Sequence, residues 1–156
     1  MQEGPINNVE RFLAHAVRLE REAARRYEEL AAAMQTHGNR ELMQFFGRMA
    51  HYSRMHLKEA VARTGFRDVP QLGQDEYEWP EGVAPETVPW AGVDALMDPR
   101  VALELALDSE RRGLAYYKSI ALITSDAELR ALASSFAAEE AQHVAALEKL
   151  LAPRCR

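Results

Sequence analysis

Three glutamates and two histidines fall where the sequence pattern predicts the inside of a helical protein: Glu20, His56, Glu110, Glu140 and His143. Glu140 and His143 stand three residues apart, which puts a carboxylate and an imidazole on adjacent turns of one helical face, where both can bind the same ion. An unpaired charge in an apolar interior costs several kcal/mol, so these groups need compensation. Carboxylate oxygens and imidazole nitrogens bind iron, manganese and zinc alike, and we therefore predict a metal site.

The elements that would position these residues are amphipathic helices, because apolar residues recur at spacings of three and four in four segments. Asn7 and Ser125, each followed three residues later by a glutamate, are predicted to cap the first and fourth helices, and Asp98 before a proline is predicted to cap the third. Gly38 and Gly65 fit the ends of the first two. The predicted helices cover residues 8–37, 39–64, 99–124 and 126–151, which is an all-α fold.

Residues 65–98 differ in composition from the helical segments on either side. Four prolines break any helix there, yet a tyrosine and two tryptophans make the segment too apolar for a free linker. We predict a packed crossover that joins two antiparallel helical hairpins in a four-helix bundle. A chain of 156 residues with 47% hydrophobic content can bury one core, so a single domain over 1–156 is expected.

The two predicted hairpins repeat each other. A shift of 90 residues lays the first helix on the third and matches Glu20 to Glu110, and a shift of 87 lays the second on the fourth and matches His56 to His143. A duplicated hairpin explains repeated leucines, but not a repeated carboxylate and histidine inside an apolar stripe. Glu20 and His56 are each 18 residues from Gly38, so antiparallel packing brings them to one height.

This order of ligand types resembles the ferritin-like di-iron carboxylate proteins, in which a Glu helix and a Glu-x-x-His helix alternate twice. The spacings from Glu20 to Tyr27 and from Glu110 to Tyr117 are most similar to rubrerythrin. The resemblance implies a ferritin-like bundle that holds two iron ions, or one, and that acts on peroxide or oxygen. It also implies that the two tyrosines hydrogen-bond ligand carboxylates, and that the protein is a homodimer.

The chain departs from the family pattern at Ser53, which the repeat aligns with Glu140, so that the second helix lacks its Glu-x-x-His. Three carboxylates facing two divalent ions leave a net charge of about +1, and one ion leaves about −1. The first hairpin is therefore expected to form the incomplete half of an asymmetric site. A redox enzyme, a non-catalytic protein that holds zinc or one iron, and an interaction module without metal all stay open.

Other polar residues are expected to lie away from the ligands. Glu59 follows His56 by three and would need a rotated helix to replace the missing carboxylate. Glu139 precedes a predicted ligand by four residues, but its repeat partner is a tyrosine, so we place it at the surface or behind a ligand. His15 and His51 are each five residues from a predicted ligand, which turns them off its face.

Composition and charge bear on partners and location. A net charge of −5 gives no basic footprint for nucleic acid or anionic lipid, and no segment is long and apolar enough to cross a bilayer. The first residues lack the features of a signal peptide. The single cysteine, Cys155, rules out an internal disulfide and a rubredoxin-type iron centre within these residues. We expect a cytoplasmic protein that takes electrons from a separate donor protein.

Overall fold

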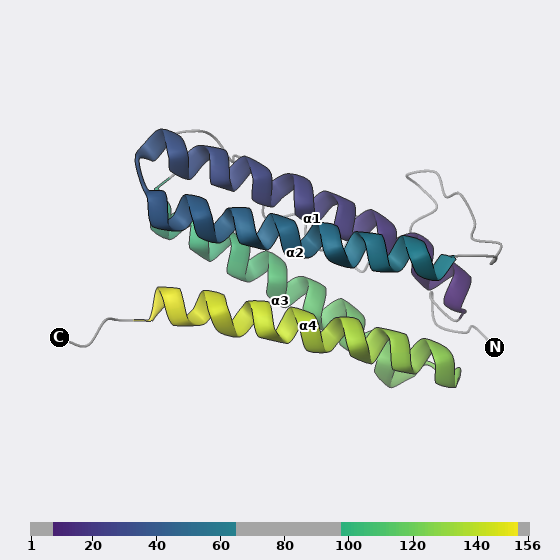
Figure 1. Cartoon of the computed structure of the whole chain (residues 1–156). Helices are drawn as coiled ribbons and strands as arrows, with labels where there is room; N and C mark the ends of the chain where they lie inside the picture. Colours follow the sequence, from purple (N-terminus) through teal and green to yellow (C-terminus); the bar gives the residue numbers. More distant parts are fainter. Residues whose placement is uncertain (1–7, 65–97, 153–156) are drawn as a thin grey trace.

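A computed structural model of the chain describes residues 8–64 and 98–152. These ranges form four helices and contain no strand (Figure 1), which confirms the all-α prediction. Each helix begins and ends within one residue of its predicted bounds. The helices are α1 (Val9–His37), α2 (Arg40–Thr64), α3 (Pro99–Ile123) and α4 (Ala127–Leu151). The predicted crossover, apart from its last residue, lies outside the described residues, as do Gly65 and Cys155.

The caps of α1 and α4 lie one residue later than the sequence predicts. Asn8, not Asn7, caps α1, and its side chain accepts a hydrogen bond of 2.7 Å from the amide three residues on. Asp126, not Ser125, caps α4, with an equivalent bond of 3.0 Å. A carboxylate also complements the positive end of the helix dipole, which favours Asp126 over a neutral serine at this position.

The predicted start of α3 and the predicted end of α1 are confirmed. The Asp98 side chain accepts from the Arg100 amide at 2.9 Å, and Pro99 fills the first position of α3, where no amide hydrogen is needed. Gly38 closes α1 with a φ of 80°, a left-handed conformation that glycine adopts without steric cost. The next residue, Asn39, accepts from the Leu42 amide at 3.0 Å and so starts α2 directly after the turn.

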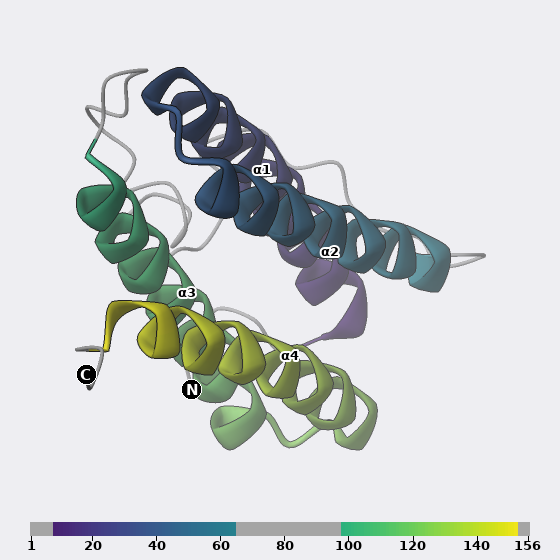
Figure 2. The same cartoon turned by 60° about the vertical axis from the view of Figure 1, so that its left-hand side comes forward.

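The helices associate as two pairs. α1 lies along α2, and α3 lies along α4, with most of the close backbone approaches inside these pairs (Figure 1). Because only residues 38–39 and 124–126 separate the members of each pair, the chain reverses direction and the paired helices run antiparallel. Figure 2 shows the two pairs facing each other, with α2 and α4 on one side. The two pairs are therefore joined mainly by contacts between side chains.

The buried apolar residues form two clusters, one towards each end of the bundle. The Phe46 cluster comprises Tyr27, Leu30, Ala33, Met34, Leu42, Phe46, Met49, Ala50, Ala102, Leu103, Ala106, Leu107, Val144 and Leu147. The Phe12 cluster comprises Val9, Phe12, Leu13, Ala16, Leu19, Ala60, Tyr116, Tyr117, Ile120, Leu129, Leu132, Ala133, Phe136 and Ala137. In every helix the changeover from one cluster to the other leaves a short interval, and these intervals contain the buried polar residues Glu20, Ser53, His56, Ser109, Glu110 and Glu140.

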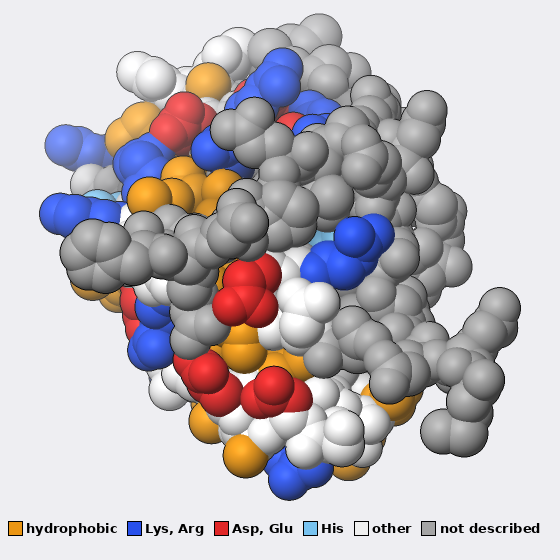
Figure 3. Space-filling model, turned by 90° about the vertical axis from the view of Figure 1, so that its right-hand side faces the viewer, with side chains coloured by type: hydrophobic (Ala, Val, Ile, Leu, Met, Phe, Trp, Pro, Cys, Tyr) orange, Lys and Arg blue, Asp and Glu red, His pale blue; other side chains and the backbone are white. Residues whose placement is uncertain are grey.

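One end of the bundle presents side chains of mixed type. Figure 3 shows the face at the end where α3 turns into α4, and there basic, acidic and hydrophobic side chains of the described residues are interspersed. At the end of α3, Leu122 and Ile123 are strongly exposed. None of the four helices is long and apolar enough to span a bilayer.

Candidate metal centre

The five predicted site residues occupy one layer between the Phe46 and Phe12 clusters. We define the polar layer as Glu20, Ser53, His56, Glu110, Glu140 and His143. Each helix contributes at least one member, because each changes cluster at the same height. The three carboxylates are only 1%, 1% and 2% exposed, in the order Glu20, Glu110, Glu140. Apolar packing on both sides therefore keeps these acids out of water.

The polar layer contains two groups of potential ligands that overlap. Glu20, His56 and Glu140 form one group, and Glu110, Glu140 and His143 form the other. Within each group the ligand atoms all lie within 4.8 Å of one another. Glu140 belongs to both groups, so it lies where one carboxylate could bridge two ions. The half-site of the first hairpin, which the sequence suggests is incomplete, obtains a third donor from α4.

Two tyrosines hold the carboxylates in place from across the bundle. The Tyr117 hydroxyl on α3 donates to Glu20 Oε1 on α1 at 3.2 Å. The Tyr27 hydroxyl on α1 donates to Glu110 Oε1 on α3. Each tyrosine therefore reaches the glutamate of the other helix pair, not the one seven residues before it in its own helix. These crossed bonds follow the internal repeat and leave the second oxygen of each carboxylate facing the layer.

The two histidines point the same ring nitrogen into the layer. His56 Nδ1 lies 3.7 Å from Glu20 Oε2, and His143 Nδ1 lies 3.4 Å from Glu110 Oε2 and 3.9 Å from Glu140 Oε2. The two rings stack, with centroids 5.6 Å apart and planes at 14°. Imidazole nitrogens and carboxylate oxygens that share one ion are about 3.0–3.4 Å apart when each bond is about 2.1 Å. The spacing in the layer is close to that range.

Three polar atoms of the layer have no hydrogen-bond partner among the described residues. His56 Nδ1, His143 Nδ1 and Glu110 Oε2 are buried and accept or donate no hydrogen bond among the described residues. Buried polar atoms are nearly always paired, so three such atoms in one layer require an explanation. A cation would satisfy all three, because each can act as a lone-pair donor. The donor set and its geometry therefore fit a bound metal ion.

Burial, together with the hydrogen-bond partners and charges nearby, shifts the pKa values of three groups in the layer. Burial raises the pKa of Glu20, and the charge of Glu110 raises it further, which outweighs the opposing effect of His56 and Tyr117. Burial lowers the pKa of His56, but Glu20, Glu139 and Glu59 overcome that effect, and the pKa is raised. Burial also raises the pKa of Glu110, but contacts with Glu140, His143 and Tyr27 bring it below its usual value.

A solved structure similar to this chain is the crystal structure of an uncharacterized conserved protein from Magnetospirillum magnetotacticum MS-1. The two sequences are 40% identical, the alignment covers 96% of this chain and 98% of that one, and the TM-score is 0.77. The chain belongs to the family of this conserved protein. No family model matches the chain. No curated protein matches it either.

In the chain described here, Ser53 is buried on α2, one turn before His56. It therefore occupies the place where the internal repeat puts a carboxylate on α4, and it offers only a neutral hydroxyl. The polar layer thus has three carboxylates for two potential ion positions. The folded layer thus has one carboxylate fewer than two divalent ions would need for neutrality, as the sequence predicts.

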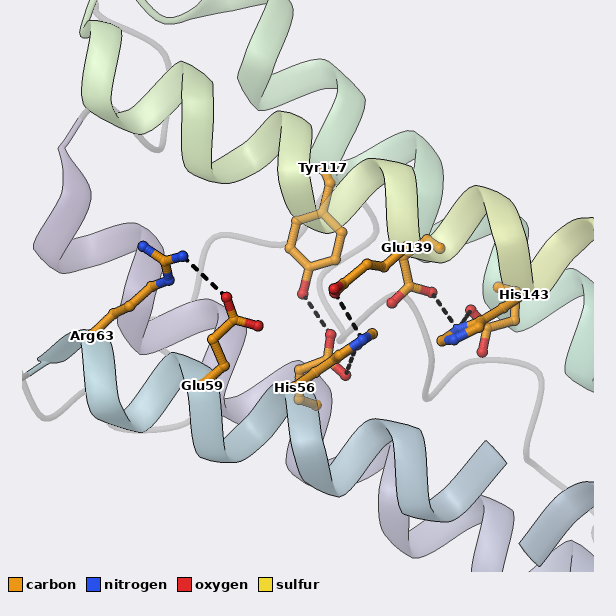
Figure 4. Close-up of polar contacts among 9 residues, drawn as sticks. His56, Glu59, Arg63, Tyr117, Glu139 and His143 are labelled. Carbon is orange, nitrogen blue, oxygen red and sulfur yellow. Dashed lines mark hydrogen bonds and ion pairs between the residues drawn. The ribbon is translucent and has the colours of Figure 1, made fainter. Parts of the chain in front are cut away.

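The sequence placed Glu139 at the surface or behind a ligand, but it did not indicate that this residue contacts His56 on the opposite helix. Glu139 Oε2 on α4 lies 2.7 Å from His56 Nε2 on α2 (Figure 4). Along the helix, spacing relates Glu139 to His143, whereas the contact is made to the histidine of the other pair. Only the packing of α2 against α4 reveals it, so no signal in a single helix could have identified the partner.

The remaining polar candidates lie off the layer. Glu59 belongs to neither ligand group and instead pairs with Arg63 at 3.0 Å (Figure 4). His15 is a buried residue of α1, and its Nδ1 lies 2.8 Å from the Arg11 carbonyl oxygen of the same helix. His51 is exposed, beside the ring of Tyr52.

An open groove of about 900 Å³ runs between α2 and α4 and reaches the layer. Its lining includes His56, His143 and Glu139, together with Tyr52, Met55 and Arg48. The two histidines are thus the residues of the layer that face the outside. A small molecule could approach the layer by this route.

Proposed function

We propose that this protein is a ferritin-like, rubrerythrin-like oxidoreductase that binds two iron ions in the polar layer and reduces peroxide or oxygen. The observation that carries the proposal is the pair of ligand groups that share Glu140. A shared carboxylate between two His-containing groups is the arrangement expected of a site with two metal ions in a helical bundle. The joining of two antiparallel hairpins by a crossover over residues 65–98 is part of the same proposal.

Each residue has a separate role in this proposal. Glu20 and His56 would hold one ion, Glu110 and His143 would hold the other, and Glu140 would be a ligand available to both. The crossed tyrosine hydrogen bonds fix the orientation of the terminal carboxylates, as partners of metal ligands commonly do. Two ferrous ions bound there would supply two electrons, one each, and become ferric; with two protons from solvent these electrons reduce one hydrogen peroxide molecule to two water molecules.

Substrate access and electron supply follow from the surroundings. The groove between α2 and α4 admits a small oxidant to the histidine side of the layer, while the apolar clusters exclude water from the other sides. A separate donor protein is proposed as the source of electrons, since the single cysteine of these 156 residues cannot form a four-cysteine iron centre. A homodimer is proposed from the resemblance to rubrerythrin.

The proposal is tested by peroxide consumption after anaerobic loading with ferrous iron. The wild-type protein should consume peroxide faster than the same amount of free iron, and Glu140→Ala, His143→Ala protein should not. Glu148→Gln is the matched control, since Glu148 lies on the same helix but pairs with Arg111 at the surface. Equal rates for wild-type protein and the double variant would reject the proposed activity.

A second candidate is a non-catalytic protein that holds zinc or a single iron for storage, sensing or structure. The observation in its favour is Ser53, which leaves the layer one carboxylate short of balancing two divalent ions. Elemental analysis of protein grown without added metal separates the two. Two irons per chain support the oxidoreductase, whereas one zinc or one iron, without peroxide consumption, supports the second candidate.

A further inference from the structure

We infer that Glu139 is a positioning residue for His56 and supplies, from outside the ligand set, the negative charge that Ser53 withholds. The inference rests on the proposed function only in so far as the polar layer binds metal. It concerns a residue that belongs to neither ligand group. The sequence suggests that the half-site with His56 is the incomplete one and so binds its ion more weakly. With Glu139 included, the half-site with His56 is expected to bind its ion more tightly.

The first step is the geometry of the His56 ring. Its Nε2 faces Glu139 Oε2 at 2.7 Å, and its Nδ1 faces Glu20 and is buried without a hydrogen bond. A neutral imidazole carries one N–H, and the nitrogen that donates a hydrogen bond is the one that holds the proton. Donation from Nε2 to Glu139 therefore leaves the Nδ1 lone pair free and aimed into the layer. Such a carboxylate partner also makes the imidazole a stronger ligand.

The second step is the charge balance. Glu20, Glu110 and Glu140 facing two divalent ions leave a net charge of about +1. Glu139 adds a fourth carboxylate in direct contact with a ligand, and the sum becomes about zero. Its side chain is 35% exposed, so water screens part of its charge, but its 2.7 Å contact is with a buried histidine, where screening is weaker.

The third step is the comparison with the second histidine. In the internal repeat, Tyr52 takes the place of Glu139, and its ring stacks on His143 with centroids 6.0 Å apart and planes at 20°. Among residues 8–64 and 98–152, none accepts a hydrogen bond from His143 Nε2. The ring of His143 is thus held by stacking, and that of His56 by a charged acceptor. The ion bound through His56 should be the tighter of the two.

Zinc titration of the full chain tests the inference, because zinc has no redox chemistry of its own. Glu139→Ala should weaken one of the two zinc affinities by about 10- to 100-fold, the usual effect of removing a partner of a ligating histidine, and leave the other unchanged. Glu139→Gln keeps an acceptor oxygen without the charge and should lose less. Glu148→Gln should match wild-type protein. Unchanged affinities in Glu139→Ala would overturn the inference.

The proton on the His56 ring gives a readout that a purely structural role would not change. In metal-free protein at alkaline pH, nitrogen NMR of the wild type should place the His56 proton on Nε2. Glu139→Ala should shift it towards a mixture of the two forms, and Glu148→Gln should not. A wild-type proton on Nδ1 would overturn the inference even if the variants fold poorly.

A double substitution tests the charge argument. Glu139→Gln in a Ser53→Glu background should cost less zinc affinity than Glu139→Gln alone, because the fourth carboxylate is then present on α2. Equal losses in both backgrounds would contradict compensation. A wild-type protein that binds no zinc would overturn the metal site and the inference with it, which distinguishes that failure from a Glu139 variant that binds two ions normally.

Discussion

Removal of Glu140 should cost the protein both metal ions, whereas removal of either histidine should cost one. The difference follows from the geometry, since Glu140 belongs to both ligand groups and each histidine to one. A ligand that binds only the folded state at 100 times its dissociation constant adds about 2.7 kcal/mol of stability for one site, and hence about 5.4 kcal/mol for two. Zinc should therefore stabilise wild-type protein by about 5 kcal/mol, His143→Ala by about half as much, and Glu140→Ala hardly at all.

Urea unfolding with and without zinc measures these differences, and elemental analysis of the same samples counts the ions. Glu148→Gln serves as control and should behave as wild-type protein does, because its ion pair with Arg111 is exposed. The reasoning fails if Glu140→Ala keeps one full zinc site. In that case the two groups would be separate sites, and the shared position of Glu140 would have no chemical meaning.

Three further changes test other parts of the layer. Ser53→Glu should tighten the binding of the weaker-bound of the two ions about tenfold or more, because a charged ligand replaces a neutral hydroxyl. A zinc titration with no gain in affinity would count against the prediction that the layer is one carboxylate short. Tyr27→Phe should lower the free energy of unfolding of the metal-free protein by about 1.5–3 kcal/mol, because its hydroxyl donates to a buried carboxylate, and urea unfolding would show this. The folded pKa values of Glu20 and His56 are raised above 4.5 and 6.5, so the stability they contribute is present below these values and lost as pH rises above them. Metal-free protein should thus become less stable from weakly acidic to alkaline pH, and Glu20→Gln should flatten the lower part of that curve; a profile that rises instead would refute the assignment.

Much of the fold could be predicted because it rests on local rules. Spacing of apolar residues located all four helices, and glycine, proline and aspartate placed most of their ends. The two caps that were wrong, Asn7 and Ser125, were each one residue early, since two adjacent residues at each position could cap and only the helix register decides between them. The course of residues 65–97 stays a prediction.

Some features of the candidate site also follow from local sequence, whereas others depend on how the helix pairs pack. The internal repeat and the count from Gly38 were enough to place Glu20 and His56 at one height, because both depend on positions within one hairpin. The sharing of Glu140 and the contact from Glu139 to His56 depend on how one helix pair faces the other. Side-chain contacts between elements far apart in sequence have no local signal, so these two features required the structure.

The position of the polar layer between the Phe46 and Phe12 clusters has a consequence for motion. In metal-free protein the two ends of the bundle are held by apolar packing, while the middle holds crowded acids that favour separation of the two helix pairs. Amide hydrogens near Glu20 and Glu140 should then exchange with solvent faster than those at either end. A bound ion would cross-link α1 and α2 to α3 and α4 at mid-height, so its release would change local opening in the centre before it changed global unfolding.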